Sequence, residues 1–238
     1  MLVAAAVCPC PPLLLPEVAA GAAPELDAAR AACTDALGLL AAARPGRLVV
    51  VGPAADRAGP ETYPEGTRGS FRGFGVDLDV RLGAAEGADP GPRLPYALAV
   101  AAWLLERTGW SDAPVEGLGV GESYPPESCV RTGRDIAARD DRVALLVMGD
   151  ASACRTLKAP GYLDERAAPF DAEVARALGA ADIAALASLD TGPAHELKAS
   201  GRAPWQVLAG AAEGTGLGGS LLYEDAPYGV GYVVAVWS

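Results

Sequence analysis

The sequence opens with the stretch Leu2-Val3-Ala4-Ala5-Ala6-Val7-Cys8-Pro9-Cys10-Pro11-Pro12, a short apolar run that prolines end. Such a run is typical of a strand that is buried on both faces. From Pro24 to Ala43 apolar side chains recur at helical spacing, and Arg47 to Val51 forms a second apolar run before a Gly-Pro pair. A strand, a helix and a strand in this order predict a parallel crossover unit.

The rest of the chain continues this alternation. Apolar runs predict strands at 115–120, 142–148 and 230–236, a half-exposed strand at 76–82 after a long loop, and one more strand after the glycines that end at 219. Helical spacing predicts helices at 94–108, 169–178, 182–189, 193–200 and 204–212, and a further crossover before 142 is weakly indicated. We therefore predict a single α/β domain, residues 1–238, built as a three-layer α/β/α sandwich around a mostly parallel or mixed sheet.

Composition limits the partners that this chain can have. Its 238 residues carry a formal net charge of -11, so it lacks the basic face that nucleic acid or an anionic membrane requires, and we expect neither as a partner. Five cysteines, an odd number, predict reduced thiols and a cytoplasmic protein without export or membrane anchor. Two basic pairs, Arg68 with Arg72 and Arg131 with Arg134, are either solvated side chains or clamps for a substrate anion.

Common catalytic motifs are poorly represented. Two glycine-rich segments, 117–121 and 214–219, lack the strand, helix and acidic residue of a dinucleotide-binding fingerprint, and we interpret them as turns. The single histidine, His195, stands beside Glu196 and is either a surface side chain or a general base. A serine or cysteine nucleophile usually needs a nearby base, and His195 is the single histidine that could act as one.

Five short segments carry a recognisable pattern. They are CPCPPLLLPE at 8–17, VVGPA at 50–54, VMGDAS at 147–152, GRAPWQVL at 201–208 and APYGVGY at 226–232. Their order resembles that of the LigB-like class III extradiol dioxygenases and their Memo-type relatives, and the resemblance covers most of the chain. It implies the LigB-like α/β fold and, in active members, the opening of aromatic rings.

The same resemblance indicates that this chain lacks the residues of the family's metal site. Active members hold Fe(II) with two histidines and a carboxylate, which leaves positions for a catechol and O₂. Here Cys10 and Ala54 stand where the two metal-binding histidines would be, and the catalytic histidine is lost after Asp150, among Ser152 and its neighbours. One histidine cannot replace three, so we expect no iron, no other cofactor and no metal ligands. Cys8 and Cys10 are either structural thiols, metal ligands or a redox pair.

The predicted strands also place a site. Three of them end at 8–12, 52–56 and 149–155, and ligands of open α/β sheets bind beyond the carboxyl ends of the strands. We predict that Cys10, Ala54, Asp150 and Ser152 converge on one cleft there. Tyr228 and the loop at 54–92 are candidate walls. The alternative is that side chains have filled this cleft and made it part of the core.

Two classes of function remain open from the sequence. The first is a divergent superfamily member that has lost iron and binds a small molecule or a partner, a second copy of the chain included. The second is an enzyme, either a ring-cleaving oxygenase of aromatic metabolism with substituted ligands or a hydrolase-like catalyst that uses Asp150, Glu224 or Cys10. The fold alone does not choose between them.

Overall fold

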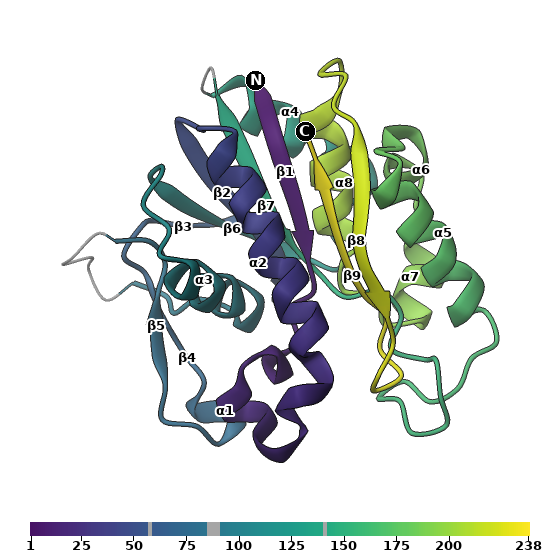
Figure 1. Ribbon diagram of the computed structural model, residues 1–238. Coiled ribbons are helices and arrows are strands. Elements are labelled where there is room, and N and C mark those ends of the chain that lie inside the picture. Colours follow the sequence, from purple (N-terminus) through teal and green to yellow (C-terminus); the bar gives the residue numbers. More distant parts are fainter. Residues whose placement is uncertain (57–58, 85–90, 140–141) are drawn as a thin grey trace.

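The protein is described by a computed structural model, which covers residues 1–56, 59–84, 91–139 and 142–238. A seven-stranded sheet with the order β3-β6-β2-β7-β1-β9-β8 lies between two layers of helices (Figure 1). The three-layer α/β/α prediction is therefore confirmed. The strands are β1 (Leu2–Cys8), β2 (Arg47–Ala54), β3 (Glu61–Tyr63), β4 (Arg68–Ser70), β5 (Asp79–Arg81), β6 (Val115–Gly121), β7 (Val143–Met148), β8 (Gly219–Asp225) and β9 (Tyr232–Trp237).

The helices connect these strands. They are α1 (Pro16–Ala19), α2 (Asp27–Ala42), α3 (Tyr96–Thr108), α4 (Pro126–Ala138), α5 (Ala167–Gly179), α6 (Ile183–Ala187), α7 (Thr191–Glu196) and α8 (Arg202–Ala212), with 3₁₀ turns at Pro12–Leu14, Ala20–Leu26 and Arg72–Phe74. In the described ranges, none of these helices combines the length and the apolar character that crossing a bilayer demands.

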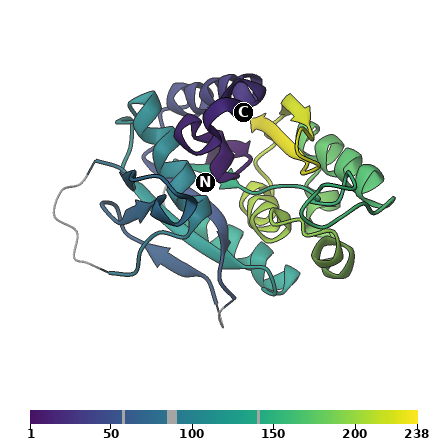
Figure 2. The same cartoon turned by 90° about the horizontal axis from the view of Figure 1, so that it is seen from below.

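The centre of the sheet is parallel. β6, β2, β7 and β1 run in the same direction, whereas β9 pairs with β1 in the antiparallel direction. The predicted crossover from β1 through α2 to β2 is parallel, but β7 lies between its two strands and pairs with both. All four parallel strands therefore end on the same side of the sheet, which we call the carboxyl edge. Figure 2 views the molecule from this side.

Two apolar layers cover the sheet. Alternate residues of β7 divide between them, so that Ala144 and Leu146 face α2 and α3, while Leu145 and Val147 face α5 and α8. Every residue of β7 is buried. This burial on both faces explains why the strand is a continuous apolar run instead of an alternating one.

Several elements differ from the sequence prediction. β3 and β4 form within the stretch predicted as a long loop, and the glycine-rich segment 117–121, interpreted as a turn, belongs to strand β6. Of the half-exposed strand expected at 76–82, only Asp79–Arg81 forms a strand, and it pairs with β4 in a separate two-stranded sheet. The weakly indicated crossover contains a full helix, α4, in which Cys129, Gly133 and Ile136 are the buried residues. The hydrophobic pattern of α4 is weak because the helix has few buried residues and two of them, Cys129 and Gly133, are small.

Glycines allow α4 to pack directly against α8. A Cβ on Gly133 would overlap the carbonyl oxygen of Val207 and would lie 2.6 Å from the nitrogen of Ala211. A Cβ on Gly210 would likewise overlap the carbonyl oxygen of Val130. The two backbones are thus in contact, which no larger residue permits.

We expect Gly133→Ala to destabilise the protein by about 2 kcal/mol or more, because the helices must separate to accept the methyl group. Gly38→Ala is the matched control, since a Cβ at that position in α2 meets nothing within 4 Å. The control should be neutral or stabilising by up to about 1 kcal/mol. Urea unfolding of both variants measures the difference, and equal stabilities would show that the two helices do not pack this closely.

Candidate functional site

A pocket of about 400 Å³ opens at the carboxyl edge, beyond the ends of β2 and β6. It is called the edge pocket below. Its lining residues come from four separate segments and are Pro53, Ala54, Ala55, Pro95, Tyr96, Glu122 and Ser200. Ligand sites of open α/β sheets lie at this edge.

A hydrogen-bonded cluster lies beside the edge pocket. The backbone amide of Cys10 donates to Oδ1 of Asp150 over 2.8 Å. The amide of Asp150 in turn donates to Oγ of Ser200 over 3.0 Å, and the amide of Gly201 donates to the Asp150 carbonyl over 2.9 Å. These bonds join the end of β1, the end of β7 and the segment before α8.

Two glycines make that junction possible. A Cβ on Gly149 would overlap the backbone of Gly201, and a Cβ on Gly201 would overlap the ring of Trp205. The segments after β7 and before α8 therefore touch through their backbones. This contact places the Ser200 hydroxyl on the wall of the pocket.

Burial controls the protonation of the cluster. Desolvation raises the pKa of the Asp150 carboxyl to about 7, even though the Cys10 amide stabilises the carboxylate. Desolvation, and after it the neighbouring Asp150, raises the pKa of the Cys10 thiol well above its usual value. The pKa of the Tyr96 hydroxyl is raised for the same main reason. Cys10 and Tyr96 are thus neutral hydrogen-bonding groups at neutral pH.

Arg202 holds the segment of the pocket wall that carries Glu122. This arginine, 2% exposed, donates to the carbonyl oxygens of Tyr124, over 2.8 Å, and of Glu122. The amide of Ser123 donates to Oδ1 of Asp56 over 2.8 Å, which ties the same loop to the segment after β2. The Glu122 backbone is therefore fixed on two sides.

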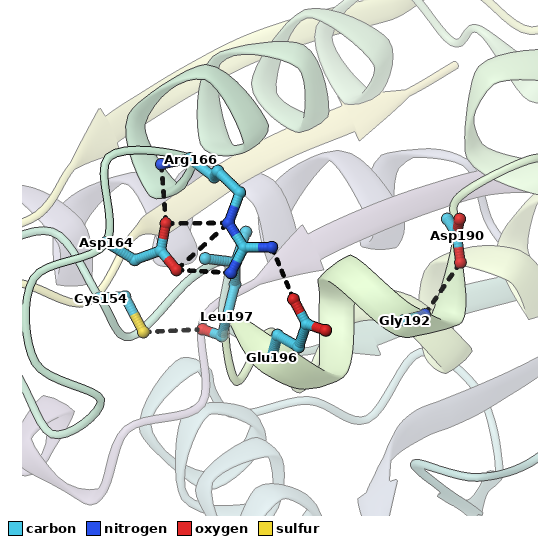
Figure 3. Close-up of polar contacts among 7 residues, drawn as sticks. All are labelled: Cys154, Asp164, Arg166, Asp190, Gly192, Glu196 and Leu197. Atoms are coloured by element: carbon cyan, nitrogen blue, oxygen red, sulfur yellow. Dashed lines mark hydrogen bonds and ion pairs between the residues drawn. The ribbon is translucent and has the colours of Figure 1, made fainter.

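The single histidine stands next to this wall. Nδ1 of His195, on α7, lies 2.8 Å from Oε1 of Glu122. Figure 3 shows how α7 is anchored: the Arg166 guanidinium bridges Asp164 and Glu196, with 2.6 Å contacts to both. The Arg166 hydrogen bonds lower the pKa of Asp164 to about 2. His195 is thus an exposed side chain paired with an acidic neighbour whose backbone is held in place.

The structure brings together three of the five predicted site residues. Ala54 lines the edge pocket, and Cys10 and Asp150 form the adjacent cluster with Ser200. Ser152 does not join them, because its fully buried hydroxyl donates to Oδ2 of Asp171 over 2.9 Å. Of the predicted loop wall, Ala54 and Ala55 line the pocket, while residues 57–58 and 85–90 lie outside the described residues.

Tyr228 and Glu224 lie elsewhere. Tyr228 lines another pocket, of about 480 Å³, together with Thr156 to Lys158 and Pro227. Glu224 is exposed on β8, which is an outermost strand of the sheet. Neither belongs to the residues that line the edge pocket.

The three polar lining residues of the edge pocket were not predicted from the sequence. Tyr96 begins α3, Glu122 follows β6, and Ser200 precedes α8. Position 122 could have been found, since it directly follows a predicted strand at the carboxyl edge. Tyr96 and Ser200 carry no such signal, because their places depend on how α3 and the segment before α8 pack.

The donor set does not fit the iron that the family resemblance implies. Ala54 offers a methyl group, Cys10 is a buried protonated thiol, and His195 faces Glu122 from another element. Across the part of the chain that is described, no three His, Cys, Asp or Glu side chains gather as a metal would need. Cys8 and Cys10 also have different neighbours, since the Cys8 thiol meets Cys33 on α2.

Comparison with known proteins shows the fold and no more. No family model and no curated protein matches the chain. A solved structure of an uncharacterized protein from Escherichia coli K12, JW3007, aligns with 99% of both chains at 17% identity and a TM-score of 0.57. The chain thus shares the overall α/β architecture of that protein.

We expect Asp150→Asn to remove a pH dependence from the stability. The pKa of this carboxyl is about 7 in the folded state against 3.8 ordinarily, so between these values the folded protein binds the extra proton. Stability therefore falls as the pH rises through that window. An amide keeps an acceptor for the Cys10 N–H and carries no charge, so the variant should be more stable than the parent at pH 8 by about 2 kcal/mol.

Urea unfolding from pH 4 to pH 8 measures this effect. Asp135→Asn is the control, because it removes a carboxylate from an exposed position of α4. Parallel stability curves for the parent and Asp150→Asn would contradict the assignment of a desolvated carboxyl to Asp150.

Proposed function

We propose that this chain is a divergent member of the LigB-like superfamily that binds a small molecule in the edge pocket without iron. The observation that carries the proposal is that Ala54, at the position of a lost histidine, lines an open pocket of about 400 Å³ instead of packed core. A volume of this size lies within the range of small-molecule sites. The five sequence segments, in the order that the family has them, support the membership.

The lining suggests what kind of molecule fits. Pro53, Ala54, Ala55 and Pro95 offer rigid apolar contacts for a flat or compact apolar body. The hydroxyls of Tyr96 and Ser200 can orient a polar substituent, since each can donate or accept a hydrogen bond. We therefore propose a small aromatic or alicyclic ligand with at least one polar group.

An enzymatic alternative is favoured by one observation. The Asp150 carboxyl, with a pKa of about 7, is suited to accept and return a proton near neutral pH, and the backbone amide of the same residue donates to Oγ of the pocket residue Ser200. A thiol nucleophile at Cys10 is less well supported, because burial keeps it protonated. Catalysis would thus be acid–base chemistry at Asp150.

The setting proposed for this function is the cytoplasm. The odd number of cysteines, none of which is disulfide-bonded, is consistent with a reducing compartment. The acidic charge favours a small-molecule ligand over nucleic acid.

The proposal predicts binding that a larger side chain abolishes. Protein purified without added metal should contain far less than one iron per chain, and it should bind catechol or benzyl alcohol with simple saturation and no change in the ligand. Ala54→Leu should weaken this binding at least about tenfold, because the added carbons occupy the apolar part of the pocket. Ala138→Leu, exposed at the end of α4 away from the carboxyl edge, is the control.

Calorimetric titration, elemental analysis and product analysis by chromatography give the three readouts. Stoichiometric iron with cleavage of catechol would restore the oxygenase interpretation. Equal binding by the parent and Ala54→Leu would place the ligand outside the edge pocket.

A further inference from the structure

The geometry points to a ligand whose polar group is a positively charged amine, held by Glu122 at the rim of the edge pocket. This inference rests on the proposed pocket and names the chemical class of its ligand. An apolar body can contact the prolines and alanines, and of the three polar lining residues, Tyr96, Ser200 and Glu122, the last is the one that carries a charge.

Among the described residues that line the edge pocket, the charged one is acidic. Glu122 supplies a carboxylate, and none of the described residues that line the pocket is a lysine or an arginine. A cation in this position would gain from the nearby carboxylate of Asp56, and the chain as a whole carries a net charge of -11. An anionic ligand would meet repulsion from the same groups.

The buried arginine does not reverse this argument. The guanidinium of Arg202 is occupied by the carbonyl oxygens of Glu122 and Tyr124 and by Oε1 of Gln206. It is 2% exposed and is not part of the pocket lining. Its role is to hold the loop, which leaves the Glu122 side chain as the charged group that a ligand meets.

The Glu122 side chain also has an oxygen that can contact the amine of a ligand. His195 occupies Oε1, and no contact to Oε2 is found in the described part of the chain. The backbone on either side is tied to Arg202 and Asp56. A carboxylate that is already oriented loses little conformational freedom when an ammonium group binds to its second oxygen.

Three probes of similar size separate the effect of charge from the effect of shape: benzylamine, benzyl alcohol and benzoate. In calorimetric titrations of the full chain at low salt, we expect benzylamine to bind about five- to tenfold more tightly than benzyl alcohol, and benzoate to bind more weakly than both. Glu122→Gln should remove the advantage of benzylamine and leave the affinity for benzyl alcohol within about twofold.

Glu127→Gln is the matched control, because it removes the same charge from an exposed position in the first turn of α4, close to Glu122 in sequence and outside the pocket lining. It should keep the preference for benzylamine. Circular dichroism of each variant checks that the fold is intact.

The outcomes distinguish two failures. If benzyl alcohol binds as tightly as benzylamine, or if Glu127→Gln removes the preference as fully as Glu122→Gln, the amine inference is wrong while the pocket remains. If none of the three probes binds to the parent protein, the proposed function itself fails, and the inference fails with it.

Discussion

The hydrogen bond from the Cys10 amide to the Asp150 carboxylate is the contact on which the candidate site depends. It joins the first strand of the sheet to β7, which enters between β1 and β2 much later in the chain. The bond also keeps a carboxyl in a desolvated position, and desolvation raises its pKa to about 7. The backbone of Asp150 then fixes Ser200 and Gly201, so one residue sets the relative positions of three segments at the carboxyl edge.

The apolar part of the edge pocket stays open because the residues that line it are small or have restricted backbones. Ala54 faces Gly119 so closely that a Cβ on the glycine would lie 2.7 Å from that of the alanine. Pro53 and Pro95 have restricted backbones, which limits how far their segments can move inward. Filling the pocket would require a long side chain from one of these positions, and none of them has one. The pocket is thus a consequence of local composition at the ends of β2 and β6.

Much of the fold could be predicted because the inner strands are continuous apolar runs. β1, β2, β7 and β9 were predictable from such runs, and α2 and α3 from helical spacing. α4 was only weakly indicated because glycine replaces a large apolar residue where it meets α8, and backbone contact leaves no hydrophobic pattern. Cys10, Ala54 and Asp150 could be placed together because they lie at or just after the ends of parallel strands. The direction of the Ser152 side chain toward Asp171, and the positions of Tyr96 and Ser200, depend on tertiary packing that no local pattern records.

A crystal structure of the protein with benzyl alcohol tests the central claim most directly, because it locates the ligand and any metal in one experiment. Our account predicts one molecule between Pro53 and Pro95, with its hydroxyl within hydrogen-bonding distance of Tyr96 or Ser200 and no anomalous iron signal at Cys10 or Ala54. A ligand bound elsewhere with the edge pocket closed, or an iron ion coordinated at the carboxyl edge, would contradict it.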